Sequence, residues 1–453
     1  MKADSIILKR SGNLPFYFIY GVLDKPALSA LESELSFIIA GREYDDRIPS
    51  ECLLYTTKKS GLRYFPVGLL DKVRTVLDAR NIGYEVDIPP EKEPSHIKVS
   101  WKTHKTLWPE QKDVLKIALS EGIGTICMPT GTGKTLVALA LINALKRKTM
   151  IVVHRRELLK QWVDEIWEVL GYEAGAVGSG VVKWRGITVA MVQSLYKSKD
   201  PLPQFDVIFF DESHHCPAKS SYKLAMKSNA STRFGLSATP KRVDGAEMKM
   251  FAAVGEIIYE SSPEGAIKRG RIVRPDFRFL STSQPMSIHK GMSFHKVYTL
   301  GITKNVERNL KIVDQAKILH KEGHTVYIHV EEIAHGRWLQ DHIPASRFVC
   351  GSDTKVDRDR VIRDFSKGRL KVCISTLLGE GVNLPGITAL IMAGGKKSEA
   401  GCIQKIGRAL RTLPGKDKAV VVDFKDTGVY LGDHWLERYA TYKKFYGRYC
   451  CDL

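Results

Sequence analysis

The sequence is poor in the features that mark membrane-spanning and secreted proteins. Its apolar run at residues 16–23 is far too short to cross a bilayer, which takes about 20 residues. The opening letters, MKADSIILKR, place no apolar core after a basic region, so no signal peptide is predicted. The eight cysteines are scattered without a Cys-x-x-Cys pair, which favours reduced thiols over a disulfide framework. We therefore expect a cytoplasmic protein without a membrane partner.

Acidic residues are scarce relative to basic ones. The 453 residues include 69 Lys+Arg against 50 Asp+Glu, a formal net charge of +19. Residues 1–100 are balanced, whereas residues 266–453 contain 33 basic and 19 acidic residues, a net charge of +14. A local excess of this size is typical of proteins that bind a polyanion such as nucleic acid, although a solvated basic surface gives the same count.

From about residue 100, short apolar runs alternate with stretches of helical periodicity. Runs such as GTICM, ITVAMV and FDVIFF predict buried strands, and LVALALINALKR predicts a helix. The alternation restarts later with HTVYIHV and KAVVVDF. The pattern predicts an α/β fold with two tandem parallel-sheet lobes, residues 98–265 and 266–453. A small α+β domain, residues 1–97, is expected before them, with helices at residues 26–39 and 68–80.

The stretch MPTGTGKT, which follows the first of these strands, has the composition of a phosphate-binding loop. Gly131 and Gly133 permit a close approach of the backbone that a Cβ would block. Lys134 would supply charge to the outer phosphates, and Thr135 a hydroxyl for Mg²⁺. The alternative is a glycine-rich turn without a ligand, because Met128 stands where the strict motif has Gly. The expected nucleotide-binding residues of this loop are Pro129, Thr130, Gly131, Thr132, Gly133, Lys134 and Thr135.

An acidic site follows in FDVIFFDESHH, where a buried strand delivers two carboxylates at its carboxyl end. Asp211 is expected to hold Mg²⁺, and Glu212 to orient or deprotonate the attacking water. His214 and His215 have no partner cluster that would make a zinc site. A hydrogen-bonding role is expected for them, and His214 is counted with the catalytic residues.

Two further segments carry polar residues after strands or on helices. SATP, residues 237–240, follows the next strand, and QKIGRALR is predicted on a helix of the second lobe. Arg408 and Arg411 are three residues apart, so one helical face would present both to a single anion. Both are expected to stabilise charge on the γ-phosphate as arginine fingers do, and Gln404 is counted with them among the catalytic residues. An ordinary solvated basic helix is the alternative.

These segments resemble, in matching order over roughly residues 100–425, the motifs of superfamily 2 helicases and translocases of the DEAH-like kind. In that family a first loop residue other than Gly is normal, and LWPEQKDVL places Gln111 where a glutamine reads adenine. HRRELLKQW, VAMVQSL and ISTLLGEGVNLPG resemble the remaining motifs. The resemblance implies two RecA-like lobes with the cofactors ATP and Mg²⁺ in the cleft between them, and arginines contributed by the second lobe.

The resemblance also assigns further contacts, with some departures. Gly381 and Asn383 match the motif that reaches the nucleotide, although the family often has Asp where Asn383 stands. His154 replaces the usual Pro-Thr, and DESH in place of D-E-A-D argues against the RNA-directed DEAD-box group. The implied contacts to the nucleic-acid backbone, none of which reads sequence, are Arg155, Arg156, Gln193, Ser194, Ser375 and Thr376.

The first hundred residues resemble, more loosely, the N-terminal domain of phage UvsW-type helicases, through DDRI and FPVGLL. Such enzymes act on branched DNA, so the resemblance implies branch migration, fork regression and unwinding of D-loops or R-loops. The partner would be DNA, branched or forked and recognised without regard to sequence, with RNA in R-loops. If a phage encodes the protein, the compartment would be the host cytoplasm. Protein partners are not indicated.

Other functions fit the same motifs. One is a duplex translocase that separates no strands and works with a partner. Another is an RNA helicase, because the motor motifs do not identify the sugar, and a third is a binding or annealing protein with an idle ATPase. The last is disfavoured by the intact Lys134, Asp211, Glu212 and Arg411. The aromatic and basic tail, HWLERYATYKKFYGRYC, would either stack on bases or pack on the second lobe.

Overall fold

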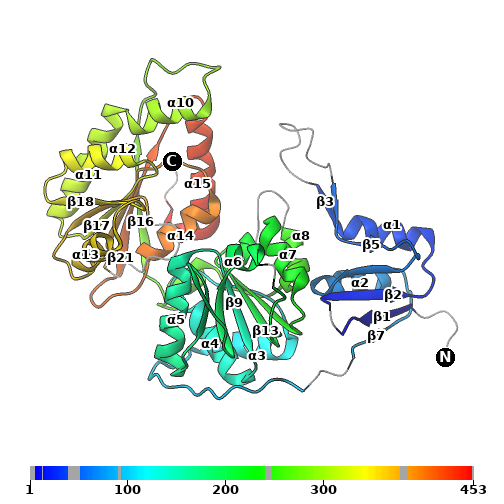
Figure 1. Cartoon of the computed structure of the whole chain (residues 1–453). Helices are drawn as coiled ribbons and strands as arrows, with labels where there is room; N and C mark the ends of the chain where they lie inside the picture. The colour runs from blue at the N-terminus through cyan, green and yellow to red at the C-terminus, as the bar shows by residue number, and fades with distance from the viewer. Residues whose placement is uncertain are drawn as a thin grey trace. The chain divides into compact units, whose positions relative to one another are not determined.

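The computed structural model describes residues 6–12, 14–38, 51–89, 93–198, 200–239, 247–377 and 386–450. The chain forms two compact units. The first runs to Glu260, apart from Pro129–Thr132, and the second begins at Ser261 and is grouped with that loop segment (Figure 1). The finer division into residues 1–97, 98–265 and 266–453 stays a prediction. Of the helices in the described ranges, none is long and apolar enough to cross a membrane.

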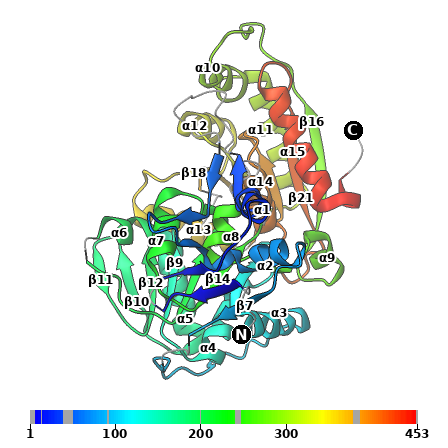
Figure 2. The same ribbon diagram turned by 90° about the vertical axis from the view of Figure 1, so that its right-hand side faces the viewer.

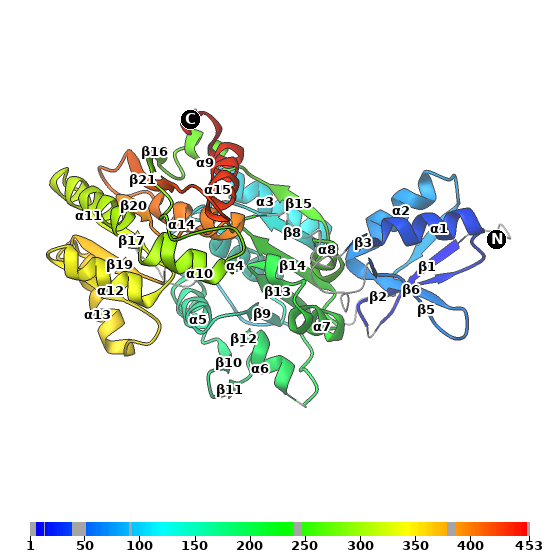
Figure 3. The same cartoon turned by 90° about the horizontal axis from the view of Figure 1, so that it is seen from above.

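The first unit begins with a five-stranded mixed sheet in the order β5-β6-β2-β1-β7. Its strands are β1 (Ile6–Arg10), β2 (Phe16–Tyr20), β5 (Thr56–Thr57), β6 (Arg63–Pro66) and β7 (Tyr84–Asp87). All neighbours are antiparallel except β1 and β7, which are parallel. Helices α1 (Lys25–Glu34) and α2 (Leu70–Asp78) lie together on one face of this sheet (Figure 3). Side chains of that face and of both helices form one apolar core.

The first predicted helix, residues 26–39, is too long. Helix α1 begins after Asp24, whose carboxylate accepts the N–H of Ala27 at 2.8 Å, and it ends at Glu34. The residues that follow pair as strand β3 (Ser36–Ile38) with β4 (Glu51–Leu53), so strand pairing wins over helical periodicity. The second helix is close to its prediction, with one 3₁₀ turn, η2 (Val67–Leu69), before α2.

The rest of the first unit contains an eight-stranded sheet in the order β11-β10-β12-β9-β13-β14-β8-β15. All its neighbours are parallel except the pair β10 and β11. The strands are β8 (Ile123–Cys127), β9 (Thr149–Val153), β10 (Gly175–Gly178), β11 (Val181–Lys183), β12 (Ile187–Met191), β13 (Val207–Asp211), β14 (Thr232–Ser237) and β15 (Ile257–Glu260). The helices are α3 (Pro109–Glu121), α4 (Lys134–Leu145), α5 (Arg156–Leu170), α6 (Val192–Lys197), η3 (Ser213–His215), α7 (Lys219–Lys227) and α8 (Glu247–Val254).

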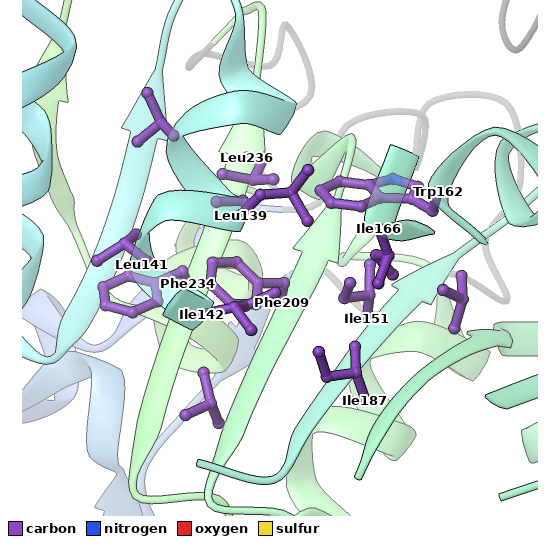
Figure 4. Packing of buried hydrophobic residues seen from close by; sticks show 14 of the residues in the cluster. Leu139, Leu141, Ile142, Ile151, Trp162, Ile166, Ile187, Phe209, Phe234 and Leu236 are labelled. Atoms are coloured by element: carbon purple, nitrogen blue, oxygen red, sulfur yellow. The ribbon is translucent and has the colours of Figure 1, made fainter. Parts of the chain in front are cut away.

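Continuous apolar runs form the centre of this sheet, as expected for strands that are covered on both faces. All five residues of β9 are buried, and α4 is apolar enough to be buried on most of its surface. Figure 4 shows Leu139 of α4 beside Trp162 of α5, and Phe209 and Phe234 of the neighbouring strands belong to the same cluster. This core fixes the strands whose ends carry the predicted site.

The N-terminal sheet and its helices pack directly on the last helix of this lobe. A Cβ at Gly68 in η2 would lie 1.9 Å from the carbonyl oxygen of Phe251 in α8, so only glycine allows this approach. Ala252 belongs to the N-terminal core, and Lys72 pairs with Glu256 at 3.3 Å. The two parts of the first unit are therefore joined by backbone-to-backbone packing.

The second unit contains a six-stranded sheet in the order β16-β21-β20-β17-β19-β18, with every neighbouring pair parallel. The strands are β16 (Arg274–Ser281), β17 (Val326–His329), β18 (Ser346–Val349), β19 (Val372–Ser375), β20 (Ala389–Met392) and β21 (Lys418–Lys425). The helices are α9 (Pro263–Lys268), α10 (Phe294–Tyr298), the π-helix η4 (Thr299–Thr303), α11 (Val306–Lys321), α12 (Ile333–His342), α13 (Lys355–Ser366), α14 (Glu399–Ala409), α15 (Leu431–Tyr446) and η5 (Gly447–Tyr449). The predicted fold class, two tandem RecA-like parallel-sheet lobes after a small α+β domain, is confirmed.

The aromatic tail packs on its own lobe. Helix α15 runs beside β16 and β21 (Figure 2), with Trp435, Tyr442 and Tyr446 buried and Tyr439 and Phe445 partly buried against them. The structure thus supports packing on the second lobe over base stacking as the role of these rings. The six cysteines whose side chains are described are buried and free of disulfides.

Candidate nucleotide and nucleic-acid site

Two glycines of the phosphate-binding loop have left-handed backbone conformations. Gly131 and Gly133 have φ angles of 89° and 82°, in the left-handed region that favours glycine. Gly133 is the N-cap of α4, and no side chain caps the helix there. The first N–H groups of α4 therefore have no capping side chain and can meet a phosphate. Lys134, at the first turn of α4, donates to the carbonyl oxygen of Met128 at 2.8 Å, so its charge lies against the loop.

Gln111 lies directly behind this loop. Its side chain is 1% exposed, and its Oε1 accepts the N–H of Trp108 at 2.9 Å at the start of α3. A Cβ at Gly133 would lie 2.4 Å from the Gln111 Nε2, so this close contact favours glycine here in addition to the φ angle. The predicted adenine-reading residue is thus in contact with the phosphate loop.

The acidic pair lies at the end of β13, which is separated by β14 from β8, the strand that precedes the loop. Asp211 ends β13, its Oδ2 accepts the indole N–H of Trp162 at 2.8 Å, and its Oδ1 accepts the N–H of Glu212 at 3.0 Å. Burial, and then the neighbouring carboxylate of Glu212, raise the pKa of Asp211 to about 6. A cation at this point would lower that pKa, and Lys134 already contributes in that direction.

Glu212 is held in an unusual conformation. Its φ of 49° is left-handed, which costs a non-glycine residue free energy and turns its side chain away from the strand direction. Its Oε2 lies 3.4 Å from the Nδ1 of His214, and among the described residues that buried oxygen accepts no hydrogen bond. A carboxylate oxygen in this condition can accept a proton from a water molecule.

Three neighbouring strands bring these residues to one edge. Strands β8, β14 and β13 are adjacent and parallel, so their carboxyl ends meet, and the Met128 N–H donates to the Ser237 carbonyl oxygen at 3.0 Å. Ser237, from SATP, also places its hydroxyl 3.4 Å from the Nδ1 of His214. Met128 at the start of the loop, the DESH turn and the SAT segment are therefore linked by contacts within the first unit.

The second unit carries the predicted arginines on and beyond α14. Gln404 is 4% exposed, and Arg408 lies in the last turn of the helix. The expectation of one helical face is wrong for Arg411, because α14 ends at Ala409 and Arg411 forms a β-bridge with Ile272. The following Thr-Leu-Pro-Gly sequence cannot continue the helix, so the chain turns there.

The predicted nucleic-acid contacts differ in exposure. Arg155 and Arg156 are exposed at the start of α5, and Gln193 is exposed but donates to the His154 carbonyl oxygen at 2.9 Å. Ser194 and Thr376 are half-buried. Ser375 is 1% exposed, and its hydroxyl accepts the Leu377 N–H at 2.9 Å, so it already has a structural role.

Part of the predicted set lies outside the described residues. Gly381 and Asn383 fall in this category, as does Pro240 of SATP. Their roles stay predictions.

The donor set suits Mg²⁺ better than a transition metal. Among the described ranges there is no group of three or more His, Cys, Asp or Glu side chains that would enclose an ion. Asp211, with the hydroxyl of Thr135, is the sparse oxygen set that Mg²⁺ takes when phosphate oxygens and water complete its shell. The uncapped start of α4 and the two left-handed glycines likewise fit the phosphates of a nucleotide.

Sequence reasoning missed the groups that hold the acidic pair. Trp162 is 2% exposed and its indole N–H donates to Asp211. A buried indole N–H needs an acceptor, but the residues around Trp162 in the sequence do not indicate which one. The His215 ring lies between two other imidazoles in tilted contacts, with centroid distances of 4.3 Å to His154 and 4.3 Å to His214. His154, which replaces the family's usual Pro-Thr, therefore adds a third ring to the imidazoles beside the DESH segment.

Two family models match this chain. "Type III restriction enzyme, res subunit" matches residues 104–242, and "Helicase conserved C-terminal domain" matches residues 308–412. The first match contains the phosphate loop and the acidic pair, and the second contains α14 with its arginine. The chain belongs to the superfamily 2 helicases. It is an ATP-dependent helicase-family enzyme of the DNA helicase and translocase group.

Similar proteins come from archaea and phages. The "DNA 3'-5' translocase XPB2" of Sulfurisphaera tokodaii is 28% identical over 72% of this chain and 83% of its own length. "Probable helicase D10" of Escherichia phage T5 is 24% identical over 80% of this chain and 79% of its length. The solved structure of T4 UvsW matches 97% of this chain and 97% of its own at 18% identity, with a TM-score of 0.45.

Proposed function

We propose that this helicase remodels branched DNA, using ATP hydrolysis to migrate junctions, regress forks or unwind D-loops and R-loops. The observation that carries the proposal is the close packing of the N-terminal domain on α8, next to the ATP-site segments. Met250 of α8 lies with its sulfur 3.5 Å from the hydroxyl of Ser213 in the DESH turn. An accessory domain fixed in this way moves with the first lobe, and can hold one arm of a branch while the motor pulls another.

In this proposal the loop residues 129–135 and Gln111 bind ATP, and Thr135 and Asp211 hold Mg²⁺, which neutralises phosphate charge. Glu212 orients the attacking water and accepts its proton, with His214 and Ser237 positioning that carboxylate. Gln404, Arg408 and Arg411 stabilise charge on the γ-phosphate, and Gly381 and Asn383 contact the nucleotide. The backbone contacts are Arg155, Arg156, Gln193, Ser194, Ser375 and Thr376, of which the exposed Arg155 and Arg156 are best supported.

The proposal is tested by ATP hydrolysis on a panel of matched substrates. The panel holds a four-way DNA junction, a forked duplex, a blunt duplex, a single strand and the RNA equivalents. We expect the highest stimulation by the junction or fork and loss of hydrolysis in Lys134→Ala and Glu212→Gln, with nucleotide binding kept in Glu212→Gln. Highest stimulation by RNA would contradict the proposal, as would equal hydrolysis with and without nucleic acid.

A second candidate is a duplex translocase that separates no strands. It is favoured by the likeness to a relative whose printed name is that of a DNA translocase. Displacement of a triplex-forming strand from a blunt duplex, with no processing of forks or junctions, would select this function.

A further inference from the structure

The N-terminal sheet has an open face rich in aromatic side chains. Because successive side chains of a strand alternate, Ile6, Leu8, Tyr17 and Ile19 belong to the core that the sheet forms with α1 and α2. The register then places a second set on the opposite face, where Phe18 stands between Tyr64 and Lys9 on the neighbouring strands. The aromatic face consists of Ile7, Lys9, Phe16, Phe18, Tyr20 and Tyr64.

The aromatic face is accessible. Tyr20 is 43% exposed and Ile7 is 38% exposed, while Phe16, Phe18 and Tyr64 are half-buried. The Phe16 and Tyr64 rings meet edge to face with centroids 5.2 Å apart, and Phe18 lies 5.7 Å from Tyr64. A T-shaped pair leaves ring faces free for a further planar group.

A cation already occupies one of these ring faces. The ammonium of Lys58, in the turn between β5 and β6, lies 4.9 Å from the centroid of Phe18 and 5.8 Å from that of Tyr64. Lys58 and its neighbour Lys59 are both exposed. A lysine at the rim of an aromatic surface can leave the ring for a phosphate, because an exposed cation–π contact is weak.

Charge on the aromatic face is graded from one edge to the other. Lys58 and Lys59 lie at the β5–β6 edge, whereas Glu85 and Asp87 lie on β7 at the far edge, and Asp87 neutralises Lys9 at 2.7 Å. A polyanion would therefore run along the β5–β6 edge, away from β7. Planar groups attached to it would reach the aromatic rings.

We propose that the aromatic face binds single-stranded DNA, with bases stacked on Phe18 and Tyr64 and phosphates bound by Lys58 and Lys59. Every base has a π-face, so aromatic stacking holds a strand without reading its sequence, and a sheet with exposed rings is a known way to arrange such stacks. The choice of DNA rests on the proposed function. At a branch, this surface would hold a displaced single strand while the motor moves.

The test compares binding of the full-length protein to two labelled oligomers of about 15 units, one of dT and one of abasic deoxyribose phosphate. Both carry the same charge, so the ratio of their dissociation constants reports base stacking. We expect the preference for dT to fall at least about tenfold in a Phe18→Leu/Tyr64→Leu variant, which keeps apolar volume but loses the rings. Lys58→Ala/Lys59→Ala should weaken both oligomers alike and lower the salt dependence.

Trp167→Leu is the matched control, because Trp167 is 62% exposed and lies on α5, which is not part of the N-terminal domain that carries the aromatic face. It should leave the dT preference unchanged. Photocrosslinking of 5-iododeoxyuridine oligomers to the wild-type protein gives a readout that needs no variant, with crosslinks expected at residues 16–20 and 63–66. Crosslinks confined to other segments, or an unchanged preference in the double leucine variant, would overturn the proposal.

The outcome is separable from that of the proposed function. Base-dependent binding at the aromatic face without stimulation of hydrolysis by any branched DNA would contradict the proposed function and support the single-strand site. Junction-stimulated hydrolysis with equal binding of dT and abasic oligomers would do the reverse.

Discussion

Replacing Gly68 with alanine should loosen the N-terminal domain from the first lobe. The added Cβ would lie 1.9 Å from the Phe251 carbonyl oxygen, 2.7 Å from the Gly255 nitrogen and 3.1 Å from the Ala252 carbonyl oxygen. Ordinary contact begins near 3.4 Å, so η2 and α8 would have to separate by about 1.5 Å. All three opposing atoms are backbone, so no side chain can rotate away to relieve the clash.

The expected cost is about 2–3 kcal/mol, near the upper end for overpacking of a well-packed interior. The Lys72–Glu256 pair offers little to resist separation, because both side chains are partly exposed and such a pair is worth at most about 1 kcal/mol. The φ of Gly68 lies outside the left-handed region, so backbone strain adds nothing to the effect.

Hydrogen exchange measures this directly at the interface. Peptides that span η2 and α8 should lose protection, and exchange about 30-fold faster for a cost near 2 kcal/mol. Gly83→Ala is the control, since a Cβ there meets no atom within 4 Å. If both variants leave the α8 peptides equally protected, the close packing of the two elements is refuted.

Three further variants test groups buried in the two units. Trp162→Phe removes the indole bond to the metal-site carboxylate, and should lower ATP turnover about tenfold without unfolding the lobe, whereas wild-type turnover would contradict a positioning role. Arg438→Met leaves the buried Asp423 without its ion-pair partner at 2.9 Å and should cost about 3–5 kcal/mol in urea unfolding, against less than about 1 kcal/mol for the exposed Arg360→Met. Burial lowers the pKa of His335 to about 3, below its usual 6.5, so stability is lost as the pH falls from 6.5 towards 3. His335→Gln should spare about 2 kcal/mol of the loss between pH 7 and pH 5, and parallel decline in the two proteins would refute this.

The lobes were predictable because their strands are continuous apolar runs between amphipathic or apolar helices. FDVIFF could only be buried on both faces, and a strand that ends in Asp211 and Glu212 places both at a ligand-binding edge. The loop glycines were equally predictable, because both positions have positive φ angles, which favour glycine. These features depend on local pattern and on a strand order that parallel α/β folds share.

What failed to be predicted depends on contacts between distant residues. Residues 36–38 leave the helical pattern because they pair with β4, and Arg411 lies beyond the end of α14, where it forms a β-bridge with the distant Ile272. The bond from Trp162 to Asp211 joins positions 49 residues apart, and the aromatic face exists only once β6 pairs with β2. No periodicity within a single segment carries that information.

The most direct test of a branched-DNA motor follows a four-way junction by fluorescence energy transfer between dyes on two of its arms. One junction has a homologous, mobile core, and the other has a heterologous core that cannot migrate without strand separation. We predict an ATP-dependent change in transfer efficiency on the mobile junction that is absent with Lys134→Ala. Rapid ATP hydrolysis on that junction with no change in transfer efficiency would contradict the account.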